Sequence, residues 1–133
     1  MTLASILPTN REVTLNDGKT YRLAKMTANV EASISEYFKF DLLDEVEPGK
    51  SGLQLVLDKV RINAAARRRV LYLFLRREYK ELTEDQVGDL IDMGNYLDVI
   101  NNIVMACCQG LPNFDEKKKE ALENFVEILS TGN

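Results

Sequence analysis

The chain has 133 residues, 45% of them hydrophobic and 29% charged, which fits one compact soluble domain and argues against disorder throughout. Its formal net charge of −4 argues against a dedicated nucleic-acid-binding protein, because neutralising phosphates requires surplus Lys and Arg. Histidine is absent, which removes the commonest general base and metal ligand and counts against an enzyme.

Neither a membrane nor the secretory pathway is indicated. No segment approaches the roughly 20 apolar residues that cross a bilayer. The stretch from Met1 to Pro8 lacks the basic and apolar regions of a signal peptide. The two cysteines, Cys107 and Cys108, are adjacent and form no disulfide framework, so a reducing cytoplasm is expected.

Residues 1–10 are expected to form a flexible arm, and residues 11–133 a single domain. This domain begins with a β-hairpin at residues 11–24, because polar and apolar residues alternate on both sides of Asn16-Asp17-Gly18. A two-residue loop would split the apolar side chains between the two faces. A three-residue loop, with Gly18 in the left-handed conformation, pairs Val13 with Tyr21. In this register all four apolar side chains lie on one face of the hairpin, so we predict it. The four side chains are Val13, Leu15, Tyr21 and Leu23.

The fold class is predicted to be mainly α, with about five to six helices in a helical body over residues 27–131. Thr27 is the predicted N-cap of a helix to about Asp44. Pro and Gly residues then predict a mobile linker near 47–52. Residues 53–80 continue the helical pattern, and whether they form one helix or two is left open by Asn63.

Three helices are predicted after this segment. Thr83 and Gln86 form a capping box that starts a short helix ending near Gly94-Asn95. The apolar residues from Leu97 to Cys108 predict the next helix, closed by Gly110 with Pro112 just beyond. A last amphipathic helix starts at Asn113 or Asp115 and ends before Gly132.

Charge is unevenly distributed along the chain. Positions 61–80 carry seven positive charges and a single acid, whereas positions 81–110 carry six acids and no Lys or Arg. Positions 31–47 carry six acids and one Lys. The simplest interpretation is that the acids complement the basic segment, within the chain or between subunits. The alternatives are a protein partner and, disfavoured by the acidic total, nucleic acid.

The run from Val70 to Leu75 is apolar all the way round a helix. This indicates a central core helix, and the alternative is an oligomer interface.

No motif points to catalysis, a cofactor or a metal. The acids between Asp41 and Glu47 lack the spacing of a calcium loop. Cys107 and Cys108 do not form a C-x-x-C pair and are expected to pack on an apolar helix. Phosphate-binding loops, dinucleotide-binding glycine patterns and nucleophile elbows are absent. We therefore predict a protein that is not an enzyme.

Two segments together resemble a known family. Residues 15–23 have the form L-N-D-G-K-x-Y-x-L, and residues 73–91 read LFLRREYKELTEDQVGDLI. A further helix follows from Leu97 to Met105. This pattern resembles the tail assembly chaperones of long-tailed bacteriophages, in which a charged helix leads into L-T-x-(E/D)-x-V-G-x-L-(I/L)-D. The resemblance covers roughly residues 13–110.

The resemblance implies a non-enzymatic protein of the host cytoplasm that is absent from the mature virion. Such chaperones keep the long, helical tape measure protein soluble while the tail tube assembles around it. The chain would be the short form, and a longer form made by ribosomal frameshifting would recruit the tail tube protein. Self-association is expected, with no nucleic-acid or membrane partner.

A chaperone for a helical client needs exposed apolar grooves between helices, best displayed repeatedly by an oligomer. The candidate partner-binding residues are Tyr72, Leu75, Tyr79, Tyr96, Ile100, Arg68, Arg69 and Arg76. Two other functions stay open: a structural virion component, such as a tail-completion or connector protein, and a small helical regulatory protein that uses its arginines on DNA.

Overall fold

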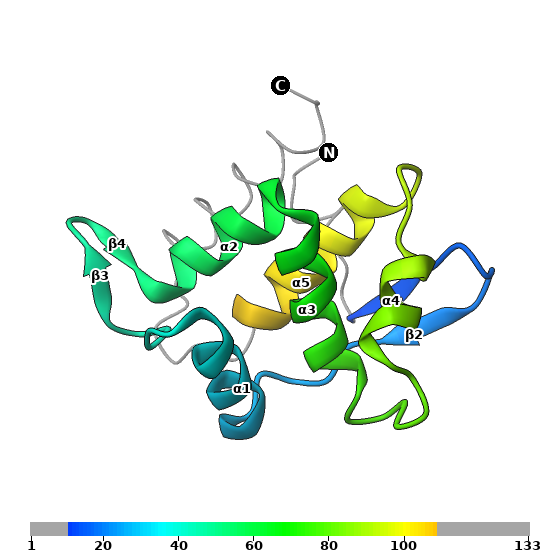
Figure 1. The fold of residues 1–133 in the computed structure, drawn as a ribbon, viewed down its shortest axis with the longest axis horizontal. Helices are drawn as coiled ribbons and strands as arrows, with labels where there is room; N and C mark the ends of the chain where they lie inside the picture. The colour runs from blue at the N-terminus through cyan, green and yellow to red at the C-terminus, as the bar shows by residue number, and fades with distance from the viewer. Residues whose placement is uncertain (1–10, 109–133) are drawn as a thin grey trace, which may run out of the picture.

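Five helices and two short β-hairpins make up residues 11–108, the part of the chain that the computed structural model describes (Figure 1). In chain order the elements are β1 (Glu12–Thr14), β2 (Thr20–Arg22), α1 (Ala28–Phe38), β3 (Glu45–Glu47), β4 (Lys50–Ser51), α2 (Gly52–Ile62), α3 (Ala64–Leu75), α4 (Glu84–Leu90) and α5 (Tyr96–Cys108). The predicted small helical domain with an N-terminal hairpin is confirmed. The predicted arm at 1–10 and the last helix after 113 lie outside the described residues.

The first hairpin has the predicted register. Val13 pairs with Tyr21, Gly18 is left-handed with a φ of +79°, and all four apolar side chains are buried. The loop also contacts the helical body, because the backbone N–H of Asn16 donates to the Leu90 carbonyl at 3.2 Å. The hairpin therefore packs on the helices of its own chain.

Helix α1 begins as predicted but ends earlier. Thr27 Oγ1 accepts a hydrogen bond from the Val30 N–H at 3.3 Å. The predicted end near Asp44 is wrong, because Lys39 turns left-handed (φ +71°) and its N–H donates to the Ser35 carbonyl. Leu42 matched the helical spacing, yet it reaches the core from an irregular segment, where its carbonyl accepts from the Leu53 N–H at 2.8 Å.

The predicted linker near 47–52 contains a second hairpin. Strands β3 and β4 pair antiparallel around a turn in which Gly49 has a φ of +78°. Ser51 then opens α2 with a capping box, in which its side chain and that of Gln54 each accept the other's backbone N–H. The Pro48-Gly49 turn was visible in the sequence, but the strand pairing was not.

Residues 53–80 form two helices, which answers the question that the sequence left open. Asn63 is extended (φ −124°, ψ 116°) and its Oδ1 accepts from the Ala66 N–H at 3.0 Å, so it ends α2 and caps α3. The predicted end of this segment near Lys80 is wrong. Helix α3 stops at Leu75, whose carbonyl accepts from the N–H groups of both Glu78 and Tyr79.

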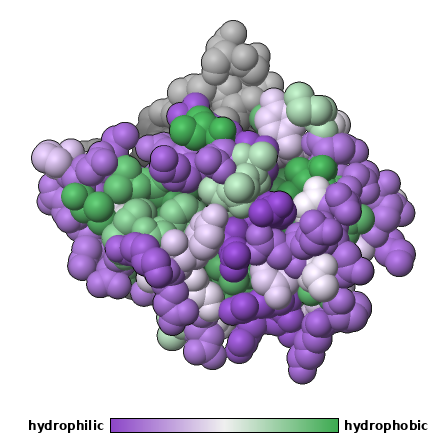
Figure 2. Space-filling model, viewed as in Figure 1, coloured by the Kyte–Doolittle hydropathy of each residue, from purple (hydrophilic) through white to green (hydrophobic). Residues whose placement is uncertain are grey.

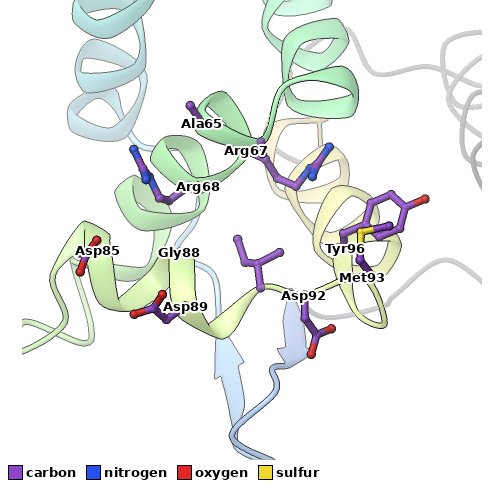
Figure 3. Close-up of a pocket in the computed structure, with 11 residues that line it drawn as sticks. Ala65, Arg67, Arg68, Asp85, Gly88, Asp89, Asp92, Met93 and Tyr96 are labelled. Carbon is purple, nitrogen blue, oxygen red and sulfur yellow. The ribbon is translucent and has the colours of Figure 1, made fainter.

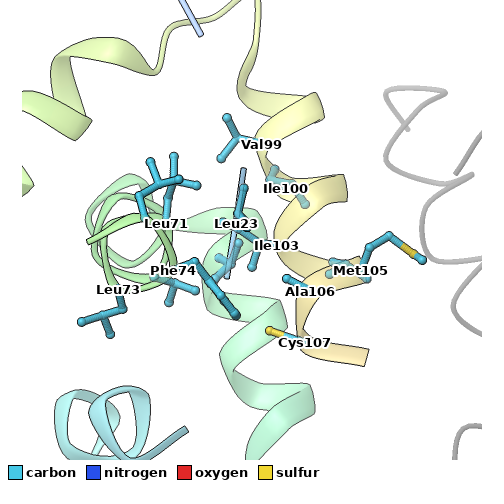
Figure 4. Close-up of a cluster of buried hydrophobic side chains, with 14 of the residues drawn as sticks. Leu23, Leu71, Leu73, Phe74, Val99, Ile100, Ile103, Met105, Ala106 and Cys107 are labelled. Carbon is cyan, nitrogen blue, oxygen red and sulfur yellow. The ribbon is translucent and has the colours of Figure 1, made fainter. Parts of the chain in front are cut away.

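Helix α3 is the centre of the core and contacts α1, α2, α4 and α5. Val70, Leu71, Leu73, Phe74 and Leu75 are buried, which confirms the core interpretation of the run from Val70 to Leu75. Figure 4 shows side chains of α3 facing those of α5, with Leu23 of the hairpin between them. None of the helices in residues 11–108 is long and apolar enough to cross a membrane.

We expect Asn63→Ala to lower the free energy of unfolding by about 1 kcal/mol, because it removes the side chain that caps α3. Urea denaturation measures the change. Asn29→Ala, at an exposed position in the first turn of α1, is the control and should stay within about 0.5 kcal/mol of the wild type. A more stable Asn63→Ala variant would contradict this, since it would mean that α2 and α3 gain by fusing.

A hydrogen bond in the loop of the first hairpin should make the stability of the protein depend on pH. The Tyr21 hydroxyl donates to Asp17 Oδ2 at 2.6 Å, and this bond raises the pKa of Tyr21 to about 12. Because the folded protein holds this proton more tightly than the unfolded chain, stability should fall as the pH rises from about 10 to about 12. Asp17→Asn should bring the pKa of Tyr21 back towards 10, measured by tyrosinate absorbance with Tyr21→Phe as the assignment control. An unchanged titration in Asp17→Asn would refute the assignment.

Candidate functional site

Two arginines near the start of α3 are paired with a single acid of α4. Arg68 Nε donates to Glu84 Oε2 at 3.1 Å. Arg69 Nε lies 2.6 Å from Glu84 Oε1 without the alignment of a hydrogen bond, so this contact is an ion pair. Glu84 stands in the first turn of α4, where the predicted capping box of Thr83 and Gln86 is confirmed. One carboxylate thus fastens α4 to α3.

Arg67 joins α3 to α2. Its Nε donates to the Val60 carbonyl at 2.9 Å and its Nη2 to the Arg61 carbonyl at 2.8 Å, so it caps the last turn of α2. The guanidinium also lies over the Tyr96 ring, 5.3 Å from its centroid. Burial lowers the pKa of Arg67.

An open groove of about 610 Å³ lies between the start of α3, α4 and the turn that leads into α5 (Figure 3). We call it the α3–α4 groove. Figure 3 shows Arg67 on the side of Tyr96 and Arg68 on the side of Asp85. The groove is lined by Ala64, Ala65, Arg67, Arg68, Asp85, Gly88, Asp89, Ile91, Asp92, Met93 and Tyr96.

The lining of the α3–α4 groove is part apolar and part charged, with arginines from α3 and aspartates from α4 and the turn after it. Ala64, Ala65 and Met93 are exposed, and Met93 is 86% accessible. Asp85 and Asp89 stand one helical turn apart on α4, and neither carboxylate has a hydrogen-bond or ion-pair partner within residues 11–108. The groove can therefore take an apolar side chain beside a cation.

The end of the groove nearest α5 is shaped by a reciprocal pair of side chains. Asp92 Oδ1 accepts from the Asn95 N–H, and Asn95 Oδ1 accepts from the Asp92 N–H, both at 2.9 Å. The buried Asn95 also donates from Nδ2 to the Leu90 carbonyl at 2.9 Å. These bonds end α4 at Leu90, so the predicted end near Gly94-Asn95 is wrong.

Gly88 brings α4 close to α3. A Cβ at this position would lie 2.7 Å from Arg68 Cδ, so a larger residue would push the arginine side chain aside. This contact gives a physical reason for the glycine in the Val-Gly-x-Leu-Ile part of the motif.

The C-terminal half of the basic segment forms a different surface. Tyr72, Arg76, Arg77 and Lys80 line a hollow of about 500 Å³, which we call the basic groove. Arg76 Nη2 donates to Ser33 Oγ at 2.8 Å, and its guanidinium lies 5.8 Å from the centroid of the Tyr72 ring. A smaller hollow of about 320 Å³ shares Arg76 and is also lined by Ser33, Glu36, Tyr37, Lys39, Arg69 and Leu73.

Apolar side chains are also exposed beside the second hairpin. Leu43 is 66% and Val46 41% accessible. In Figure 2 hydrophobic surface gathers at the left, where Figure 1 shows β3 and β4. This surface is separate from the α3–α4 groove.

The predicted partner-binding residues divide into three groups. Leu75 and Ile100 are fully buried in the core, so their side chains line no surface groove. Tyr79 holds the hairpin, because its hydroxyl accepts from the Arg22 N–H at 3.0 Å and its ring packs edge-on against Tyr21. Five of the predicted residues do line hollows: Arg68 and Tyr96 in the α3–α4 groove, Tyr72 and Arg76 in the basic groove, and Arg69 in the adjoining one.

Sequence reasoning missed Asp85, Asp89 and Met93 as groove residues. The spacing of the two aspartates, one helical turn apart, was a usable signal that they share a face of α4. The exposure of Met93 had no signal, because it depends on the turn held by Asp92 and Asn95.

The buried cysteines have little capacity for chemistry. Burial raises the pKa of Cys108 to about 11 and that of Cys107 well above its ordinary value, which disfavours the reactive thiolate. No group of three acidic or cysteine side chains within residues 11–108 is placed to hold a metal ion.

We expect Glu84→Gln to lower the free energy of unfolding by about 0.5–1 kcal/mol at low salt, because Arg68 and Arg69 lose their shared, partly exposed partner. Roughly 1 M salt should erase most of this difference by screening. Asp85→Asn is the matched control: it removes the neighbouring acid from the same helical turn but breaks no ion pair among the described residues. Equal losses in the two variants would show that only the helix dipole was affected.

Comparison of the chain with models of protein families, with curated proteins and with solved structures found no match in any of the three. Function therefore has to be inferred from the surfaces of the molecule and from the motif in residues 73–91.

Proposed function

We propose that the protein is a non-enzymatic tail assembly chaperone of a long-tailed bacteriophage. In this proposal it binds apolar helix faces of the tape measure protein in the α3–α4 groove and keeps that client soluble during tail assembly. One observation carries the proposal: residues 82–91, which carry part of the resemblance to this family, form one wall of the α3–α4 groove.

The groove suits a helical client. A bound helix would place an apolar side chain against Ala64, Ala65 and Met93 and leave its polar face in water. The apolar lining is small and the groove is open, so each contact would be weak. Weak contacts suit a chaperone, since the client has to be released when the tail tube closes around it.

The remaining parts of the proposal follow from the family. The protein acts in the host cytoplasm and is absent from the mature virion. Self-association would present many α3–α4 grooves along one client, and multivalent binding would then supply the avidity that a single groove lacks. A longer form, made by frameshifting, would recruit the tail tube protein.

Co-expression with the tape measure gene of the same tail operon tests the proposal. The soluble fraction of the tape measure protein should rise when the wild-type chain is present. It should fall back to the level of the tape measure protein alone with the double variant Ala64→Glu, Met93→Asp, because both changes put charge on exposed apolar positions of the groove. Neither side chain is part of the core, so the variant should remain folded.

Ala28→Glu is the control for the Ala64→Glu change. Ala28 is the exposed first residue of α1, as Ala64 is of α3, so both changes add an acid to the first turn of a capped helix. The control should keep the tape measure protein soluble. An equal effect of the groove variant and the control on the solubility of the tape measure protein would contradict binding of this client in the α3–α4 groove. Recovery of the chain from purified virions would instead favour a structural component.

A further inference from the structure

We propose that the basic groove, lined by Tyr72, Arg76, Arg77 and Lys80, binds an acidic segment of a partner protein. This site is distinct from the α3–α4 groove and does not depend on the client proposed above.

The first argument is the distribution of charge pairs. The ion pairs found within residues 11–108 are Lys50–Asp58, Arg68–Glu84 and Arg69–Glu84. Within these residues the expected complementation of the basic segment by its acidic neighbours is found for Arg68 and Arg69 alone. Arg77 and Lys80 are exposed and have no hydrogen-bond or ion-pair partner in this part of the chain.

The second argument is that Arg76 is held in place before any ligand binds. Its Nη2 is bonded to Ser33 Oγ at 2.8 Å, and its guanidinium lies over the Tyr72 ring. A guanidinium has five N–H donors, so donors remain for a carboxylate after the bond to Ser33. Because the side chain is already ordered, less conformational entropy is lost on binding.

The third argument is that the backbone carrying these cations is fixed. Leu75 accepts from the N–H groups of Glu78 and Tyr79, and the Tyr79 carbonyl accepts from the Leu82 N–H. The Tyr79 hydroxyl is bonded in turn to the Arg22 N–H of β2. Arg77 and Lys80 therefore stand on a turn that is tied to both α3 and the hairpin.

Compensation of a helix dipole does not account for all of this charge. Cations near a helix C-terminus are favourable, and α3 ends at Leu75, directly before Arg76. The C-terminus of a helix, however, carries only about half a negative charge. Residues 76–81 carry three cations and two acids, and their net charge of +1 still exceeds half a negative charge, so a small surplus is left for an anionic partner.

An acidic peptide fits this surface better than nucleic acid does. Glu78 and Glu81 interrupt the cations of the turn, which disfavours the continuous row of phosphates of a nucleic acid, whereas the carboxylates of a peptide can be spaced to meet the cations alone. The adjoining hollow contains Glu36. The Tyr72 ring already has the Arg76 guanidinium over it, so that face is not free to stack on a base.

The test uses the absence of tryptophan from the chain. A short glutamate-rich peptide with a single tryptophan reports binding to the full chain by fluorescence anisotropy, without background from the protein. We expect binding at low salt that weakens steadily as salt is added. The double variant Arg77→Glu, Lys80→Glu should weaken it at least about tenfold, because attraction becomes repulsion at two positions.

Lys25→Glu with Lys59→Glu is the matched control, since it changes the net charge by the same amount at exposed positions outside the basic groove. It should weaken binding by no more than about threefold. Arg76→Lys keeps the charge but loses the planar guanidinium, so it should weaken binding by about tenfold. Circular dichroism checks that every variant is folded.

Three results would overturn the inference. The first is no binding of the glutamate-rich peptide at low salt. The second is an equal effect of the groove variant and its control, which would mean that only overall charge matters. The third is displacement of the peptide by a single-stranded oligonucleotide at lower concentration than by an unlabelled acidic peptide. Solubility of the tape measure protein should be unchanged in Arg77→Glu, Lys80→Glu, which separates failure here from failure of the chaperone proposal.

Discussion

Burial of the apolar residues all round α3 is the constraint on which the rest of the structure depends. Leu73, Phe74 and Leu75 are all buried although successive residues of a helix point about 100° apart, so a single neighbour cannot cover them. Helices α1, α2, α4 and α5 all contact it, and Leu23 of the first hairpin lies between α3 and α5 (Figure 4). The partly exposed residues of α3 include Arg68 near its start and Tyr72 near its end, which line the α3–α4 groove and the basic groove respectively.

The two ends of α3 differ in whether their cations are paired with an acid of the same chain. At the N-terminal end Glu84 pairs with both Arg68 and Arg69, and the groove beside them combines exposed apolar side chains with charged ones. At the C-terminal end no acid in the described part of the chain pairs with Arg77 or Lys80. The same basic run in the sequence thus becomes two surfaces of different character, one suited to apolar side chains and the other to anions.

Features set by neighbouring residues could be predicted from the sequence. The register of the first hairpin follows from alternation and from Gly18, and the start of α4 from the spacing of Thr83 and Gln86. Features that depend on contacts between residues distant in the sequence could not be predicted. Helix α1 stops early because Leu42 packs beside α2, and the α3–α4 groove exists only because residues of α3 and α4 meet in space. The motif in residues 73–91 did not show which of its side chains face outward.

Arg67 gives the molecule a mechanical property. Its two hydrogen bonds span the break at Asn63 and join the end of α2 to the start of α3, so the two helices are braced across their joint. A guanidinium keeps its proton throughout the physiological pH range, even where burial favours its loss. A brace made of this group does not loosen with acidification, unlike one made of histidine or a carboxylate. The junction between α2 and α3 should therefore be rigid, so that α3, which forms one wall of the α3–α4 groove, keeps a constant angle to α2.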